Sequence, residues 1–238
     1  MLAVRDGKIK ISSKGDGMKS TNAEKGDGVI EGGSIEISSE NDGIQSESTF
    51  SVYGGEIKIL SGGGSDNGKE HHDNMGFGRG FGQNQSFEED NSDTVSLKGI
   101  KAKSDISVNG GDISVNSADD AFHSDTLIDI SEGNINLMTG DDGIHSEGEV
   151  NISGGSVRIG KSYEGIEGSL IKVNGGTIHL NSDDDGFNVS SSDRNAELLL
   201  DISGGFIYVN AAGDGLDSNG NIVMTGGTVL VNGPESNN

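Results

Sequence analysis

Acidic residues recur at a constant spacing along the chain and are the residues best suited to chemistry. One acid stands ten residues after the start of most Gly-Gly pairs or their equivalents: Asp16, Asp42, Asp120, Asp142, Glu164, Asp185 and Asp214. A second acid precedes three of them, at Asp119, Asp141 and Asp184, and Lys98 replaces the acid in one unit. If the units stack, these side chains form a column of carboxylates.

Such a column needs a means of reducing the repulsion between its charges. Two charges about 4.8 Å apart repel by about 1 kcal/mol in water and by about 3–4 kcal/mol at an effective dielectric constant of 20. Protonation or a bound cation removes this cost. Because the ligands are oxygen atoms, Ca²⁺ is the expected ion and zinc is disfavoured. The candidate metal ligands are Asp42, Asp119, Asp120, Asp141, Asp142, Glu164, Asp184, Asp185 and Asp214. A solvated corner of Asp-Gly turns is the alternative.

The Gly-Gly pairs, or near matches to them, recur with a spacing that is mostly 22 residues. They are Gly32-Gly33, Gly54-Gly55, Gly110-Gly111, Glu132-Gly133, Gly154-Gly155, Gly175-Gly176, Gly204-Gly205 and Gly226-Gly227. Three short strand patterns recur in each unit, and no sustained helical period is present. The pattern predicts an all-β fold, a single-stranded parallel β-helix with three short strands per coil, as one domain over residues 1–238. Asparagines at one equivalent position, Asn116, Asn181, Asn210 and Asn232, are expected to form an internal amide ladder.

The composition excludes several classes of partner. The 238 residues carry 39 acids against 16 lysines and arginines, a net charge of −23. This charge repels nucleic acid and anionic lipid and attracts cations. The lack of cysteine excludes disulfides and a thiolate metal site, and no apolar run is long enough to span a membrane. We expect the sequence to be a fragment of a longer protein, with a leader, a lipid anchor and the terminal coils outside it.

Several repeated strings resemble one bacterial protein family. They are "SADDAFHSD", "GDDGIHSEG", "KSYEGIEG", "SDDDGFN" and "AAGDGLDSNG", together with "KGIKAKSDISVNGG". The chain resembles the largely clostridial carbohydrate-binding β-helix proteins, which are similar in fold to family nine pectate lyases. This resemblance implies a right-handed β-helix, bound calcium, secretion, and binding of cellulose or acidic plant polysaccharide at the cell surface. It places the metal role on the two Asp-Asp pairs that end at Asp120 and Asp142, with Glu164 next.

Outward-facing residues beside the column are candidates for ligand contact. Lys101, His123, His145 and Glu167 stand two residues after the Gly or Ala that follows the column position. The histidines have three interpretations, as metal neighbours, sugar contacts or ordinary surface, and the last is favoured. Lyase relatives use a lysine base, and Lys101 is the candidate here, although it lies one coil before the aspartates.

Two insertions interrupt the repeat, at residues 62–95 and near residues 190–197. The first is rich in Gly and Asn and is expected to be mobile. Its Phe77, Arg79 and Phe81 could stack on a sugar and donate hydrogen bonds to it. An excursion without a role is the alternative for this segment.

Three functions compete. A calcium-binding carbohydrate-binding module of the cell surface, without catalysis, is preferred, because the later outward positions hold Glu167 and Asn188 rather than a base. A calcium-dependent polysaccharide lyase that uses Lys101 is the second. A structural or adhesive surface rod is the third. A glycosidase with paired carboxylates is not excluded by the composition.

Overall fold

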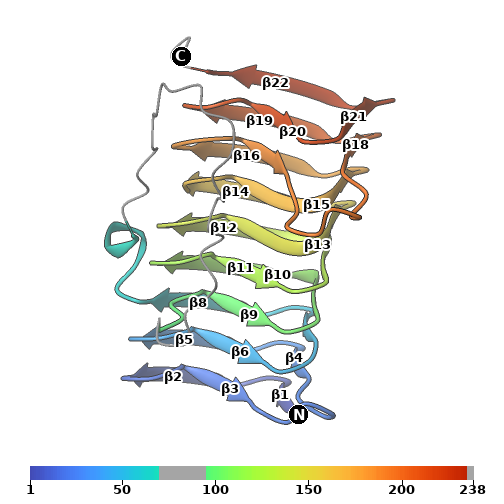
Figure 1. Ribbon diagram of the computed structural model, residues 1–238. Coiled ribbons are helices and arrows are strands. Elements are labelled where there is room, and N and C mark those ends of the chain that lie inside the picture. Colours follow the sequence, from blue (N-terminus) through green and yellow to red (C-terminus); the bar gives the residue numbers. More distant parts are fainter. Residues whose placement is uncertain (70–94, 235–238) are drawn as a thin grey trace.

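Every strand in the described part of the chain pairs in parallel with strands of the neighbouring coils. The computed structural model describes residues 1–69 and 95–234. Figure 1 shows the coils stacked one above another along a rod, with the N-terminus at one end and the C-terminus at the other. The predicted parallel β-helix is therefore confirmed as a β-solenoid of about nine coils, each of roughly 22 residues.

The strands form three rows, and each row contains one strand segment from successive coils. The first row, which follows the glycine pairs, contains β2 (Lys8–Ser13), β5 (Ser34–Ser39), β8 (Glu56–Ser61), the second halves of β10 (Asp105–Ser117) and β12 (Leu127–Thr139), β14 (Ser156–Lys161), β16 (Thr177–Ser182), β19 (Phe206–Ala211) and β22 (Thr228–Asn232). The second row contains β3 (Met18–Ser20), β6 (Ile44–Ser46), β9 (Ile100–Ala102), β11 (Phe122–Ser124), the first parts of β13 (Ile144–Ile152) and β15 (Ile166–Val173), β17 (Phe187–Val189) and β20 (Leu216–Ser218). The third row contains β1 (Leu2–Val4), β4 (Gly28–Ile30), β7 (Phe50–Val52), the remaining parts of β10, β12, β13 and β15, β18 (Leu199–Ile202) and β21 (Asn221–Met224).

Strict alternation along each strand fills the interior of the rod. In β5, Ile35 and Ile37 are buried while Glu36 is exposed between them. Phe50, Phe122 and Phe187 are fully buried and are the largest side chains of the core. Each coil covers its apolar residues with the coils above and below, so a slender core needs few bulky residues. The apolar pattern, and not the overall hydrophobicity, therefore specifies the fold.

Glycine is required at the corner before the first row. Gly155 has a φ of 75°, and a Cβ there would lie 2.8 Å from the carbonyl oxygen of Gly133 on the coil before. The second glycine of each pair has positive φ, and no other residue type does in the described chain. Glu132 can therefore replace the first glycine of its pair but not the second.

The asparagines expected to form an internal ladder are not in the interior, although the side-chain amide of Asn232 does donate to Asn210 Oδ1 on the neighbouring coil. The alternation in β10 buries Val115 and Ser117 and leaves Asn116 between them half-buried. Asn181 and Asn210 are likewise half-buried, and Asn232 is exposed. The buried neighbours that follow Asn116, Asn181 and Asn210 are Ser117, Ser182 and Ala211.

The two insertions leave the rod at opposite ends of the second-row strands. The described start of the first insertion follows β8 and includes the 3-10 turn η1 (Ser65–Asn67), the one helical element among the residues described. The backbone N–H of Ser65 donates to Asn116 Oδ1 at 2.7 Å, and the Lys161 Nζ lies 2.9 Å from Asp66 Oδ1. The second insertion follows β17 and lies on the other side of the rod in Figure 1.

Candidate functional site

The acids of the repeat form a continuous stack at the corner between the first and second rows. We call this stack the acid column; it consists of Asp16, Asp42, Lys98, Asp120, Asp142, Glu164, Asp185 and Asp214. Backbone hydrogen bonds fix the register, because Ala121 N–H donates to the Asp142 carbonyl at 3.0 Å and Gly143 N–H to the Glu164 carbonyl at 3.0 Å. The predicted stacking of acids on successive coils is therefore present in the structure.

Carboxylates of the column also bond to the backbone of the next coil. Asp42 Oδ1 accepts from the Lys98 N–H at 2.8 Å, and Asp120 Oδ1 accepts from the Asp142 N–H at 3.2 Å. Asp185 Oδ1 accepts from the N–H of the next column residue at 2.7 Å. Each of these oxygens satisfies a corner N–H that no ladder bond reaches. The column acids thus have a structural role independent of any ligand.

Lys98 is the internal cation of the column. Its Nζ lies 2.8 Å from Asp119 Oδ1 and 2.8 Å from Asp120 Oδ2, and its side chain is only 13% exposed. Burial opposes the charge of Lys98, but Asp120 and Asp119 raise its pKa above the ordinary value. Burial alone would raise the pKa of Asp120, but Lys98 and the neighbouring imidazoles hold it well below its usual range. The lysine that interrupts the sequence pattern therefore neutralises its densest part.

His123 and His145 lie against the column and are not ordinary surface residues. They pair in register on β11 and β13, and their ring centroids are 4.9 Å apart. His123 Nδ1 is 2.8 Å from Asp120 Oδ2, and His145 Nδ1 is 3.6 Å from the same oxygen. Their side chains are 13% and 21% exposed. Burial lowers the pKa of His145, but bonds to Asp120 and Asp142 raise it well above its usual value.

The later part of the column has no lysine or arginine paired with it among the described residues. Burial raises the pKa of Asp142 well above its usual value, and the nearby acids add to the effect. Burial, together with Glu167, raises the pKa of Glu164 to about 8. The side-chain amide of Asn188 donates to both carboxylate oxygens of Glu164, at 2.8 and 2.7 Å. Burial and the neighbouring acids therefore favour the neutral forms of Asp142 and Glu164 in this segment.

The structure brings some sequence-predicted residues together and leaves others apart. Three groups have ligand atoms within 4.8 Å of one another and could hold a metal ion: Asp119, Asp120 and Asp141; Asp120, His123 and His145; and Asp142, His145 and Glu167. Asp42, Glu164, Asp184, Asp185 and Asp214 belong to none of these groups among the residues described. Lys101 stacks beside His123 in the second row. Phe77, Arg79 and Phe81 lie outside the described residues.

An exposed aromatic patch on the first row was missed by the sequence analysis. Phe206 and Tyr208 alternate outward on β19 and are 37% and 36% exposed. The His179 ring on β16 lies 5.8 Å from the Phe206 ring and 5.9 Å from the Tyr208 ring. We call these three residues the aromatic patch. The register His179↔Tyr208 spans 29 residues because of the second insertion, which obscures the pairing in the sequence.

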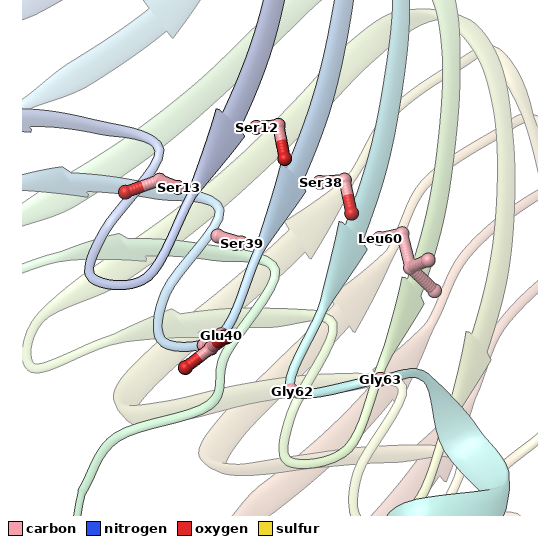
Figure 2. A pocket seen from close by; sticks show the side chains of 8 residues that line it. All are labelled: Ser12, Ser13, Ser38, Ser39, Glu40, Leu60, Gly62 and Gly63. Atoms are coloured by element: carbon pink, nitrogen blue, oxygen red, sulfur yellow. The ribbon is translucent and has the colours of Figure 1, made fainter.

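A small polar pocket lies where the first three strands of the first row end. Its volume is about 400 Å³. Figure 2 shows the serines of successive coils beside it, with Glu40 at its lower edge. Its lining residues are Ser12, Ser13, Ser38, Ser39, Glu40, Leu60, Gly62 and Gly63. The pocket offers hydroxyl groups but no aromatic surface.

The fold and the site define a β-solenoid protein with a charged corner that could hold a metal ion and with a separate aromatic face. The chain belongs to the family of carbohydrate-binding domain-containing proteins, whose model matches residues 1–143 and 141–238. Comparison with curated proteins and with solved structures gave no match. Among the residues described, no helix is long and apolar enough to cross a membrane.

Proposed function

We propose that this chain binds a neutral polysaccharide, without catalysis, through the aromatic patch. The single observation that carries the proposal is the cluster of exposed Phe206 and Tyr208 with half-buried His179 on the first row. Aromatic rings present apolar faces on which the C–H groups of a pyranose can pack, while the Tyr hydroxyl can hydrogen-bond. Family membership supports the same class of ligand.

The surroundings of the patch carry little charge, and Arg158 is the one lysine or arginine among the outward first-row side chains from β12 to β22. The outward side chains of the first row from β12 to β22 include no aspartate or glutamate: Asn134, Asn136, Met138, Ser156, Arg158, Gly160, Thr177, His179, Asn181, Phe206, Tyr208, Asn210, Thr228, Leu230 and Asn232. This face is free of acids although the chain carries 39 of them.

Binding to insoluble cellulose and to soluble glucans tests the proposal. We expect Phe206→Ala combined with Tyr208→Ala to weaken binding at least tenfold. Tyr53→Ala is the matched control, because Tyr53 is a 57% exposed aromatic residue away from the patch and should be neutral. Unchanged affinity in the double variant would remove the patch from the binding surface.

The absence of catalysis is part of the proposal. Lys101, the candidate lyase base, stacks between Gln45 and His123 in the second row and is remote in sequence and strand row from the aromatic patch. Incubation with polygalacturonate and Ca²⁺ should release no unsaturated product, as measured by ultraviolet absorbance. Product formation that is lost in Lys101→Ala would instead assign a lyase.

Calcium is a further part of the proposal and belongs to the oxygen-only group Asp119, Asp120 and Asp141. Carboxylates on adjacent coils suit a hard cation. Lys98 already holds Asp119 and Asp120, so calcium must compete with its ammonium group. Calorimetric titration of the chelator-treated protein with CaCl₂ measures this binding, and a titration without heat or gain in melting temperature would exclude it.

We also propose that the protein works outside the cell or at its surface, since an insoluble glucan is accessible only there. Labelling of intact source cells with an antibody against the chain should be positive without permeabilisation. Labelling only after permeabilisation would contradict this location.

A further inference from the structure

Two copies of an Asp-x-x-His spacing build a mixed nitrogen and oxygen cluster on adjacent coils. Asp120 and Asp142 occupy the column corner, and His123 and His145 are the first outward residues of the second-row strands that follow. The short corner directs acid and imidazole to the same side of the rod. Stacking of the two coils then brings all four side chains together.

Two distances in this cluster are close to those between neighbouring ligands of a tetrahedral ion, and the ligand atoms of Asp120, His123 and His145 lie within 4.8 Å of one another. His145 Nδ1 is 3.6 Å from Asp120 Oδ2 and 3.4 Å from Asp142 Oδ2. Bonds of about 2.0–2.1 Å in a tetrahedron place neighbouring ligand atoms about 3.3–3.4 Å apart. His123 Nδ1 lies closer to Asp120 Oδ2, at 2.8 Å, as expected for a hydrogen bond that a metal would replace.

The outer nitrogens of both imidazoles face further carboxylates. His123 Nε2 is 3.8 Å from Asp125 Oδ1. His145 Nε2 is 3.7 Å from Glu147 Oε1 and 3.6 Å from Glu167 Oε2. Histidine ligands of metals commonly present one nitrogen to the ion and the other to a carboxylate, which fixes the tautomer. At 3.6–3.8 Å these carboxylates face the imidazoles at distances longer than a hydrogen bond.

The charge of the cluster also suits a divalent cation. The side chains of Asp120 and Asp142 are 2% and 8% exposed, so their charges are poorly solvated. Together with Asp119 they outnumber the Lys98 ammonium by two charges, as three carboxylates against one ammonium. Neutral imidazoles and one dication would balance this set.

We propose that Asp120, His123 and His145 bind one divalent transition-metal ion of the Zn²⁺ type, which must displace the Lys98 ammonium from Asp120 Oδ2. Imidazole nitrogen favours such ions over Ca²⁺, which prefers oxygen ligands. The ion would link β11 to β13 and so join two coils at the corner. This site is distinct from the aromatic patch, and its test does not depend on sugar binding.

Titration of the chelator-treated full chain with ZnCl₂ and, separately, with CaCl₂ tests the site. We expect one equivalent of Zn²⁺ to bind and to raise the melting temperature. Co²⁺ should bind in its place and give the visible absorption of a tetrahedral complex with nitrogen ligands. Absence of Zn²⁺ binding, or an octahedral Co²⁺ spectrum, would overturn the proposal and leave the histidines as ion-pair partners.

Variants separate this site from the oxygen-only group. His123→Asn combined with His145→Asn should lower Zn²⁺ affinity at least a hundredfold while circular dichroism remains that of a β protein. His123→Asn alone, the milder change, should lower it about tenfold. Asp141→Asn should not alter Zn²⁺ affinity, and His179→Asn is the matched control for an unrelated histidine. Full Zn²⁺ affinity in the double histidine variant would refute the site.

Discussion

Lys98 and Asp120 occupy the same position of the acid column on adjacent coils, and Lys98 Nζ lies 2.8 Å from Asp120 Oδ2. The same nitrogen also bonds to Asp119 Oδ1 at 2.8 Å. One residue in the repeat thus supplies a positive charge where the preceding and following coils supply negative ones. The Lys98 ammonium therefore reduces the repulsion between the carboxylates. From the sequence alone, a bound metal ion is expected to have this role.

Replacement of this lysine should therefore destabilise the protein. Lys98→Ala leaves two poorly solvated carboxylates without their counterion, which typically costs about 3–5 kcal/mol when a buried pair loses one partner. Denaturant unfolding in the presence of chelator measures the loss, and Lys103→Ala, at an exposed lysine, is the control. Added CaCl₂ should restore part of the stability, because it gains access to Asp119 and Asp120. A variant as stable as the original chain in chelator would show that Lys98 is dispensable.

Stability should fall as the pH rises through the titration of Asp185. Burial raises the pKa of Asp185 to about 6, and the carboxylates of Asp184, Asp217 and Asp214 add to the effect. The folded chain therefore binds a proton more tightly than the unfolded chain, so the group costs stability only once it ionises. Its unfavourable contribution develops between about pH 4 and pH 6 and is constant above that range. The carboxyl is half-buried, so solvent screening keeps the effect small.

Thermal melts across this range, in chelator, compare the original chain with Asp185→Asn. Between pH 4 and pH 6.5, the melting temperature of Asp185→Asn should fall less than that of the original chain. Asp193→Asn, in the exposed second insertion, should retain the full decline. A steeper decline in Asp185→Asn would reverse the sign assigned to this carboxyl.

The corner glycines should tolerate no side chain. Gly155→Ala requires an L residue at a φ of 75° and places its Cβ 2.8 Å from the Gly133 oxygen, so we expect a loss of about 2–3 kcal/mol. Gly160→Ala is the matched control, since the nearest atoms would lie 3.7 Å away and its φ is ordinary. Chemical denaturation of both variants should separate them clearly, and equal stabilities would argue against the strained corner.

Neutral and acidic polysaccharides should differ in their dependence on cations. Binding to a neutral glucan through Phe206 and Tyr208 should be the same in chelator, in CaCl₂ and at high salt, because no charge is involved. A surface with a net charge of −23 should hold polygalacturonate only when a cation mediates. Parallel binding assays in these buffers check both expectations. Tight binding of polygalacturonate in chelator would contradict the electrostatic argument.

The spacing of the acids in the sequence predicts the acid column, but it does not predict which groups neutralise the negative charge of the column. Equal spacing of the acids is enough to stack them, because parallel pairing carries the same register from coil to coil. In the sequence Lys98 is only an interruption of the acids, and the pattern favours a surface role for the histidines. The 22-residue spacing does not determine the direction in which a side chain points at a tight corner. Only the folded corner shows that Lys98, His123 and His145 reach Asp120.

The aromatic patch escaped detection for a related reason. Seven residues beyond the usual spacing separate His179 from Tyr208, so the two rings do not stand out in the linear repeat. The insertion is accommodated at the corner between the second and third rows, and the first row continues in register across it. The His179 and Tyr208 rings are therefore neighbours in the folded chain, because β16 and β19 still pair in register.

The sequence by itself determined the solenoid, its coil length, its inward apolar residues and the stacked acids, because each depends on a period that repeats along the chain. The tertiary structure alone decided which charges meet, how deeply the histidines are buried and where an uncharged aromatic face forms. These properties depend on side-chain direction at corners and on how insertions are absorbed, and neither is encoded in the period.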